Sequence, residues 1–392
     1  MRMIWPACWH DSTITRAISA RPEQRMRVLL LSAYAAQSHR YWQAALQQMF
    51  PRWSWTVLEL PPRYFSWRVR GNPLYWSIAE RELLQAPHDL LIATSMSDLA
   101  TLRGLVPALG EIPALLYFHE NQFAYPQDKQ QHSLLEAQMV SLYGALAADT
   151  IAFNSRFNRD TFLDGCDALL ARLPDRVPAG VVTSLRDKSC ILPVPLMPAE
   201  PRAGQGAATP DRRAGIRLLW SARFEHDKGG EGLLRILHNL EAAQEDFEVA
   251  VTGQQFRRSP PVFAEIEREF SHRLVQFGYV DSEARYTELM QWANVALSTA
   301  LHEFQGLALM RAVQCGCVPV VPDRLVYREI YDPLYRYPSS PQTPASEAAA
   351  AAELICAFGK ALPPPPDLSA YFPQVLSGRY ERTIRALQDS NR

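Results

Sequence analysis

One carboxylate at the start of a predicted helix is the strongest candidate for ligand chemistry in this chain. In the stretch LHEFQGLALMRAV, residues 301–313, Glu303 and Gly306 stand where an amphipathic helix begins. The first N–H groups of a helix have no partner within it and lie at the positive end of its dipole, so they attract anions. A neighbouring carboxylate accepts hydrogen bonds from hydroxyl groups. The pattern predicts a site for a polyhydroxylated anion, and a helix cap before a core helix is the alternative interpretation.

Two positive side chains follow an earlier apolar run in the same half of the chain. The residues WSARFEHDKGG, 220–230, place Arg223 and Lys228 between a predicted strand and a predicted helix. A guanidinium group forms forked hydrogen bonds and an ammonium group supplies a compact charge, so together they can stabilise a departing diphosphate. The alternative is that both are solvated surface charges. Their position ahead of Glu303 in one domain favours the site.

A polar segment in the first half of the chain also follows a predicted buried strand. His119, Glu120 and Asn121 come directly after the run ALLYF. Open parallel sheets bind ligands at the carboxyl ends of their strands, so these residues are candidates to orient sugar hydroxyls and to place an acceptor. The spacing is not that of the zinc motif HExxH. A structural turn that satisfies backbone groups is the alternative.

Basic and aromatic residues follow the first two predicted strands. Ser38 and His39 come after the first strand, and Arg63, Trp67 and Arg68 come after the second. Arginines that contact phosphates and aromatic rings that stack on bases suit a single-stranded RNA loop. The alternative is that the aromatic rings pack under an ordinary loop while the arginines are solvated.

The composition limits the classes of function. The chain has 392 residues, 47% of them hydrophobic, which is enough for two cores, and its formal net charge of -1 provides no global attraction for nucleic acid. No apolar run is long enough for a membrane helix, and no segment indicates an obligate protein partner. The six cysteines lack disulfide-scaffold and zinc spacing, so we expect a cytoplasmic protein. Because no Asp-x-Asp pair occurs, we also expect neither a metal nor a cofactor.

Apolar runs alternate with helix-sized intervals along most of the chain. This alternation predicts an α/β protein with two Rossmann-like, doubly wound parallel sheets that face a cleft. We expect a disordered or extraneous leader over 1–25, a first domain over 26–197, a linker over 198–215, a second domain over 216–366 and a last helix within 367–392 that can cross to the first domain. The predicted strands are 27–31, 55–60, 90–94, 114–118, 150–153 and 190–194, then 217–221, 248–252, 275–279, 295–299 and 318–321.

Several ordered motifs together resemble a known family. In addition to the segments above, Phe153-Asn154-Ser155 stands in the expected order, and the resemblance covers about residues 26–387. The motifs are similar to those of the glycosyltransferase-like domain-containing protein 1 family, which belongs to the retaining GT-B glycosyltransferases. That family is associated with tRNA-queuosine alpha-mannosyltransferase activity. The resemblance implies GDP-mannose as the donor and the cyclopentenediol of queuosine in a tRNA anticodon loop as the acceptor.

The resemblance also implies roles for individual residues. Glu303 would bind hydroxyls of the donor sugar, Arg223 and Lys228 would stabilise the leaving diphosphate, and His119 would line the reacting face. The donor contacts would comprise Arg223, Lys228, Glu303, Phe304, Gln305, Gly306, Leu307 and Arg311, and the acceptor contacts Ser38, His39, Arg63, Trp67, Arg68, His119, Glu120 and Asn121.

Arg311 is the main departure from the family pattern. In these transferases a second glutamate, separated from the first by seven residues, binds the ribose of the nucleotide, but this chain has Arg311 at that position. An arginine cannot accept hydrogen bonds from ribose hydroxyls, although it can pair with a diphosphate or with Glu303. Two other functions therefore stay open: a transferase acting on a lipid or glycan acceptor, and a tRNA-binding homologue deficient in turnover.

Overall fold

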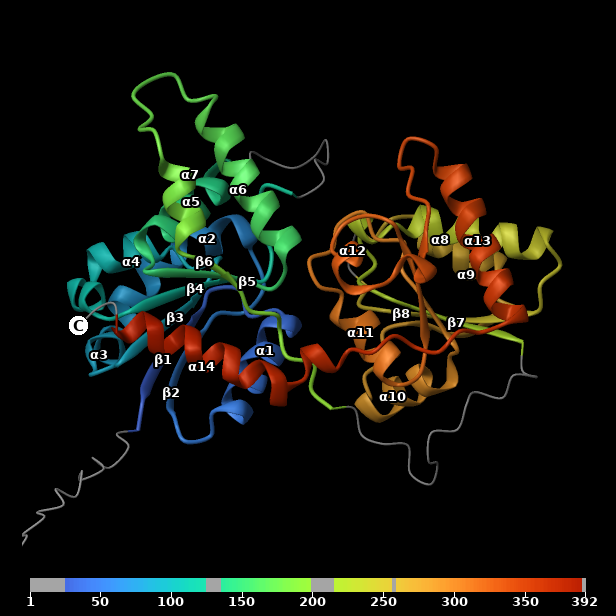
Figure 1. Ribbon diagram of the computed structural model, residues 1–392, viewed down its shortest axis with the longest axis horizontal. Coiled ribbons are helices and arrows are strands. Elements are labelled where there is room, and N and C mark those ends of the chain that lie inside the picture. The colour runs from blue at the N-terminus through green and yellow to red at the C-terminus, as the bar shows by residue number, and fades with distance from the viewer. Residues whose placement is uncertain (1–24, 125–134, 199–214, 256–258, 390–392) are drawn as a thin grey trace, which may run out of the picture.

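The computed structural model describes residues 25–124, 135–198, 215–255 and 259–389. Within these ranges the chain forms two α/β domains, each built on a six-stranded sheet, that lie side by side (Figure 1). Every strand pair in both sheets is parallel, which confirms the predicted doubly wound α/β architecture. The predicted leader except for residue 25, and the predicted linker except for residues 198 and 215, lie outside the described residues.

The first sheet has the strand order β2-β1-β3-β4-β5-β6, so the chain reverses its direction of travel between β1 and β3. Its central strands are continuous apolar runs because helices cover both faces. The strands are β1 (Arg27–Ser32), β2 (Ser54–Glu59), β3 (Leu90–Thr94), β4 (Ala114–Phe118), β5 (Thr150–Phe153) and β6 (Ser189–Ile191).

The helices of the first domain divide between the two faces of its sheet. Side chains that alternate along β1 and β4 enter two separate cores, one under α1 and the last helix and the other under α2, α4, α5, α6 and α7. These helices are α1 (Gln37–Met49), α2 (Phe65–Ala79), α3 (Arg81–Gln85), α4 (Leu99–Leu105), α5 (Leu135–Ala147), α6 (Arg156–Leu170) and α7 (Val181–Asp187).

The second sheet has the strand order β12-β11-β10-β7-β8-β9 and shares one core with its helices. Its strands are β7 (Ile216–Ser221), β8 (Phe247–Thr252), β9 (Leu274–Gly278), β10 (Val295–Leu297), β11 (Val318–Pro322) and β12 (Arg336–Tyr337). Its helices are α8 (Gly230–Ala242), α9 (Val262–Glu269), α10 (Glu283–Trp292), α11 (Leu307–Gln314), α12 (Tyr327–Ile330) and α13 (Pro344–Lys360).

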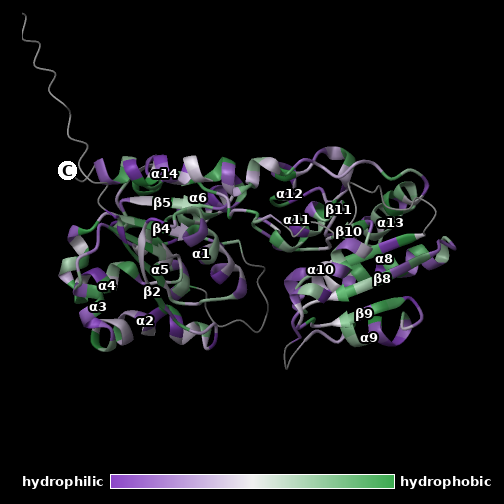
Figure 2. Ribbon diagram, turned by 90° about the horizontal axis from the view of Figure 1, so that it is seen from below, coloured by the Kyte–Doolittle hydropathy of each residue, from purple (hydrophilic) through white to green (hydrophobic). Residues whose placement is uncertain are grey.

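The last helix, α14 (Pro373–Asp389), leaves the second domain and packs on the first (Figures 1 and 2). Leu376 and Ile384 enter the core under α1, where the indole N–H of Trp42 donates to the hydroxyl of Tyr380 at 2.9 Å. The Arg379 guanidinium donates to the carbonyl of Ile191 at 3.0 Å. The chain therefore ties its first domain to its own C-terminus by buried contacts.

Two further contacts join the domains. The side-chain amide of Gln305 donates to the carbonyl of Val194 at 2.8 Å and accepts from its N–H at 2.9 Å. Glu329 of α12 accepts from the backbone N–H of Arg156 at 3.0 Å and from that of Phe157, at the positive end of α6. The domains are thus held by paired hydrogen bonds and not only by the connecting chain.

The strands β6 and β10 end more than one residue earlier than the sequence predicts, and residues beyond each early end make a contact. We expected strands to reach Val194 and Thr299, but β6 ends at Ile191 and β10 at Leu297. The backbone of Val194 pairs with Gln305 instead, and the Thr299 hydroxyl donates to the carbonyl of Lys228 at 3.0 Å. Apolar patterning alone does not mark these ends, because both segments remain buried after leaving the sheet.

Candidate functional site

The Glu303 carboxylate stands at the start of α11, as the sequence predicts. Its Oε1 atom accepts from the backbone N–H groups of Phe304, Gln305 and Gly306 at 3.0, 3.4 and 3.0 Å. Gly306 has φ of 76°, in the region that favours glycine, and turns the chain into the helix. The carboxylate is therefore fixed by the turn before the helix. These three N–H groups belong to the turn, whereas the first N–H group of α11 itself is that of Leu307.

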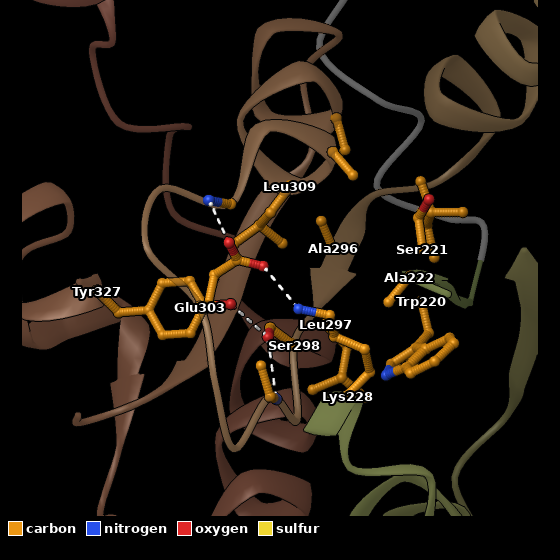
Figure 3. A pocket seen from close by; sticks show the side chains of 15 residues that line it. Trp220, Ser221, Ala222, Lys228, Ala296, Leu297, Ser298, Glu303, Leu309 and Tyr327 are labelled. Atoms are coloured by element: carbon orange, nitrogen blue, oxygen red, sulfur yellow. Dashed lines mark hydrogen bonds and ion pairs between the residues drawn. The ribbon is translucent and has the colours of Figure 1, made fainter. Parts of the chain in front are cut away.

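Lys228 approaches the same carboxylate from the loop after β7. Its Nζ atom lies 3.5 Å from Glu303 (Figure 3). The same atom lies 3.2 Å from Asp227 and 3.0 Å from the carbonyl oxygen of His302. The two loops pack closely, since a Cβ atom at Gly229 would lie 2.0 Å from the carbonyl oxygen of Thr299. Close backbone packing thus places an ammonium group beside a carboxylate.

Burial and charge act in opposite directions on this pair. Burial by itself would raise the pKa of Glu303, but Lys228 and the hydrogen bonds from the neighbouring backbone lower that pKa below its usual value. Burial would lower the pKa of Lys228, but Glu303 and Asp227 raise it. Both groups are therefore charged at neutral pH. The pair offers a cation to a phosphate and an anion to hydroxyl groups.

Arg223 lies at the rim of this arrangement. Its guanidinium pairs with Glu225 at 3.0 Å, and its side chain is 44% exposed, whereas that of Lys228 is only 13% exposed. Arg223 and Lys228 lie on the same loop between β7 and α8. Lys228 is the one that contacts Glu303, at 3.5 Å, so the convergence of both cations on one ligand stays a prediction.

A pocket opens between the carboxyl ends of β7 and β10 and the first turns of α11. In Figure 3 the Glu303 carboxylate, the Lys228 side chain and the Tyr327 ring surround it on one side, and Ser221 and Ala222 lie on the other. Small side chains on α11 leave the helix backbone close to the pocket. The lining also includes Gly306, Ala308, Leu309 and Ala312.

Three of the predicted donor contacts have structural roles instead. Phe304 is 4% exposed and lies against Phe157 of the first domain, with ring centroids 5.9 Å apart. The side-chain amide of Gln305 is hydrogen-bonded to the backbone of Val194. Leu307 packs against the first-domain core under α1. The sequence put these residues beside the ligand because they flank Glu303, but successive side chains in a turn point in different directions.

Arg311 does not reach Glu303. Its guanidinium pairs with Glu283, the first residue of α10, and lies over the Tyr286 ring, with the Arg311 Cζ atom 5.4 Å from the ring centroid. The Tyr286 hydroxyl in turn lies 2.7 Å from the hydroxyl of Ser221, which lines the pocket. Sequence reasoning did not single out Glu283, because nothing in its local pattern links α10 with α11.

In the first domain, His119 and His39 form a stacked pair at the carboxyl end of β4. Their ring centroids are 4.1 Å apart, and the Trp42 ring meets His119 edge-on at 4.9 Å. Burial lowers the pKa of His39 to about 4, although a hydrogen bond with the backbone of Tyr34 opposes the shift. Burial and the neighbouring His39 lower the pKa of His119. Both imidazoles are therefore neutral at pH 7.

Four buried polar atoms on this face find no hydrogen-bond partner among the residues that the structure describes. They are the hydroxyl oxygens of Ser32 and Thr94, Nδ1 of His39 and Nε2 of His119. The strand order reverses between β1, which ends at Ser32, and β3, which ends at Thr94. His119 follows β4, the strand next to β3. Ligands of open α/β sheets bind at this position. The two hydroxyls were missed because each ends an apolar run.

The remaining acceptor candidates behave differently from one another. Asn121 is 0% exposed, and its amide binds Asn158 and Thr161 while its oxygen accepts from two backbone N–H groups, so it braces the loop and does not reach an acceptor. Glu120 is partly exposed beside it.

The basic and aromatic candidates gather at the start of α2. Trp67 is 58% exposed, and the Arg63 guanidinium lies over the exposed ring of Tyr64, with the Arg63 Cζ atom 5.7 Å from the ring centroid. Arg68 is half-buried, and Ser38 is exposed on the first turn of α1. These residues offer aromatic faces and positive charge on one side of the first domain.

Two features are absent from the described residues. No group of three or more His, Cys, Asp or Glu side chains there is arranged to hold a metal ion. No helix among the described residues is both long and apolar enough to cross a membrane. Metal independence itself stays a prediction.

Comparisons with solved structures identify the class of fold. The apo form of the lipopolysaccharide outer core galactosyltransferase WaaB has a TM-score of 0.61 at 11% identity, over 92% of this chain and 99% of that chain. Sucrose-phosphate synthase from Thermosynechococcus elongatus has a TM-score of 0.62 at 12% identity, over 93% and 100%. A model described as glycosyl transferases group 1 matches residues 212–355. The protein is a glycosyltransferase with the GT-B fold.

Further matches identify the family. A model described as tRNA-queuosine alpha-mannosyltransferase N-terminal matches residues 27–196. A Drosophila melanogaster protein described as tRNA-queuosine alpha-mannosyltransferase is 31% identical over 312 residues, which are 78% of this chain and 81% of that protein. The chain belongs to the tRNA-queuosine alpha-mannosyltransferase family.

Proposed function

We propose that this glycosyltransferase transfers mannose from GDP-mannose to the cyclopentenediol of queuosine in tRNA, with retention of the anomeric configuration. The observation that carries the proposal is the buried pair of Lys228 and Glu303 beside the pocket at the start of α11, because it supplies a cation and an acceptor for hydroxyls together. Family membership supports the choice of tRNA and of mannose. A solved relative of the fold contains UDP, at a TM-score of 0.55 and 12% identity, but the fold does not select a base.

The reaction we propose is a front-face displacement in the cleft. The bond between the anomeric carbon and the β-phosphate oxygen breaks, and a bond from that carbon to an acceptor hydroxyl oxygen forms on the same face. The acceptor proton passes to the departing phosphate oxygen. Lys228 and Arg223 stabilise the negative charge that develops on the diphosphate, while Glu303 holds the mannose hydroxyls. In this scheme the two positive side chains and the start of α11 carry the charge of the leaving group without a metal.

The first domain presents the acceptor in this scheme. His119 and His39 are neutral at pH 7, and each has one ring nitrogen without a hydrogen-bond partner among the described residues. These nitrogens can donate hydrogen bonds to a diol or accept them from it. Arg63 and Trp67, together with the partly buried Arg68, provide phosphate and stacking contacts for the anticodon loop. We place the reaction in the cytoplasm, a proposal supported by the free thiols of the described cysteines.

The direct test is a transfer assay with two tRNA preparations. We expect a mass gain of one hexose on the nucleoside when the protein is incubated with GDP-mannose and queuosine-containing tRNA, and none with queuosine-free tRNA. The gain should persist in a chelator, and UDP-glucose should replace GDP-mannose poorly. Transfer to both tRNA preparations would refute the proposed acceptor. Loss in the chelator with rescue by manganese or magnesium would refute metal independence.

A further inference from the structure

The short helix α12 carries one side chain of the pocket and one contact to the first domain. Tyr327, its first residue, lines the pocket, and the Tyr327 hydroxyl lies 2.6 Å from that of Ser298 (Figure 3). Two residues later, the Glu329 carboxylate accepts hydrogen bonds from the backbone N–H groups of Arg156, at 3.0 Å, and Phe157. A helix of only four residues therefore connects the pocket of the second domain with α6 of the first.

Glu329 completes the cap of α6. The first N–H groups of a helix have no partner within it, and they lie at the positive end of its dipole. In α6, which spans 15 residues, the Ser155 hydroxyl accepts from the N–H of Asn158 at 3.1 Å, and Glu329 accepts from the two N–H groups before it. A charged acceptor makes these hydrogen bonds stronger than neutral ones. Because the acceptor comes from the other domain, the cap forms only while the domains are arranged as in this structure.

The start of α6 is hydrogen-bonded to the segment that carries His119. The amide of Asn154, just before the helix, donates to the carbonyl oxygen of His119 at 2.8 Å. The amide of Asn158, on the first turn, donates to the carbonyl oxygen of Phe118 at 3.0 Å. The amide of Asn121 in turn donates to the side-chain oxygen of Asn158 at 2.9 Å. The position of α6 therefore sets the position of the loop after β4.

The same turn of α6 also meets the segment of Glu303. The Phe157 ring lies against the ring of Phe304, with centroids 5.9 Å apart, and Phe304 follows Glu303 directly. The Arg156 guanidinium lies 3.7 Å from Glu329 on a side chain that is 69% exposed, so this ion pair adds little to the contact. Two segments that line the pocket, the Glu303 turn and α12, therefore both rest on the first turn of α6.

We propose that Glu329 is a positioning residue for transfer. Its carboxylate caps α6 across the domain boundary and so holds the loop of His119 in a fixed place relative to the pocket. Glu329 acts through α6 and not by contact with a substrate. The inference rests on the proposed function, because it takes His119 to face the acceptor. Loss of the negative charge should therefore slow transfer between two bound substrates and leave the binding of the donor nucleotide unchanged.

The test compares Glu329→Gln with the natural protein in transfer and in binding. Glutamine keeps the size of the side chain but removes the charge and one accepting oxygen. Single-turnover transfer of mannose at saturating donor and tRNA should fall about tenfold to a hundredfold, since hydrogen bonds to a charged group are among the stronger ones. The dissociation constant of GDP, measured by calorimetry without tRNA, should stay within about twofold, because the side chains of the pocket are unchanged. A role in stability alone would lower the melting temperature and leave the rate per folded molecule as it is.

Three further variants separate the cap from other effects. Glu329→Asp keeps the charge on a shorter side chain and should recover part of the lost rate. Arg156→Ala keeps the backbone N–H groups that the carboxylate binds, so it should transfer at the natural rate. Glu353→Gln is the matched control, because it removes an exposed carboxylate from α13 in the same domain. Thermal melting of every variant checks the fold, and rates are compared per folded molecule.

Each outcome bears on Glu329 separately from the proposed function. A folded Glu329→Gln protein that transfers at the natural rate would overturn the inference, and so would an equal loss of rate in Arg156→Ala. If Glu329→Gln does not fold, Glu329→Asp takes its place: a reduced rate with unchanged GDP binding supports the inference, and a natural rate refutes it.

The domain arrangement can also be measured without substrates. If the natural protein transfers no hexose to queuosine-containing tRNA, the proposed function fails, and small-angle X-ray scattering of the ligand-free proteins then decides the role of Glu329. Glu329→Gln should have a larger radius of gyration than the natural protein, because the domains lose the cap that joins them. An equal radius would show that Glu329 does not hold the domains in place.

Discussion

Replacing Lys228 with alanine removes the only ammonium group that contacts Glu303 in the described structure. At their separation of 3.5 Å, Coulomb's law gives about 5 kcal/mol at an effective dielectric constant of about 20, which is an upper figure for this interaction. Transition-state stabilisation by one preorganised charge is smaller, and its loss lowers rates by about two to three powers of ten. We therefore expect Lys228→Ala to reduce single-turnover transfer by that factor.

The assay must separate lost catalysis from lost folding. Lys228 also donates to the carbonyl of His302 and faces Asp227, so the variant leaves two carboxylates without this cation. Urea unfolding measures the structural cost, and rates are compared at saturating donor. Lys360→Ala is the matched control, since it removes an exposed lysine at the end of α13 in the same domain.

The same variant should acquire a pH dependence. In the natural protein the pKa of Glu303 lies below its usual value of 4.5 and that of Lys228 above 10.5, so the pair stays charged between these values. Without Lys228, burial becomes the main influence and raises the pKa of Glu303. Donor binding should then weaken as the pH falls through the raised pKa. A folded variant that transfers mannose at the natural rate, with donor binding independent of pH, would refute this reasoning.

Three other predictions concern separate parts of the protein. Glu303→Gln should lower transfer at least a hundredfold while the melting temperature changes little, and an unchanged rate would remove Glu303 from the site. Trp67→Ala should weaken tRNA binding by roughly 1 to 3 kcal/mol in a filter-binding assay and leave GDP binding unchanged. Val375→Ala on α14 is the control, because Val375 is also an exposed apolar residue. Equal weakening of tRNA binding and GDP binding would contradict an acceptor role for Trp67. The pKa of His39 in the folded protein is about 4, below the ordinary value of 6.5. As the pH falls, the unfolded chain therefore binds a proton at this residue before the folded protein does. His39 should lower the free energy of unfolding by about 2 kcal/mol between about pH 7.5 and 5. His39→Gln should flatten this loss in urea titrations, and an equal slope in both proteins would show that His39 is not buried in its neutral form.

Local sequence patterns were sufficient to predict the fold, because the strands and helices of a buried parallel sheet follow short-range physical rules. Continuous apolar runs such as LLIAT, residues 90–94, fit strands that are buried on both faces, and the intervals between them fit helices. Glu303 and Lys228 were also accessible from sequence, since each lies in the segment that connects a strand to the next helix, at the carboxyl edge of a parallel sheet. No long-range information is needed for such placements.

The tertiary structure decided which side chains near these positions are available to a ligand. Three side chains lie in segments that the sequence places at the site but make contacts with residues distant in the sequence instead. They are those of Phe304, Gln305 and Asn121. Burial also decided that His39 and His119 are neutral, because desolvation depends on everything packed around a ring and not on its neighbours in the chain.

The sequence by itself determined the two sheets, the order of the motifs and the acid and base that begin the donor site. Only the tertiary structure brought Glu283 to Arg311, since 28 positions separate the two residues and each lies on its own helix. Sequence patterns report the face of an element that is buried, whereas partners on different helices are chosen by how those helices pack. The partner of the arginine at position 311 could therefore be found only from the fold.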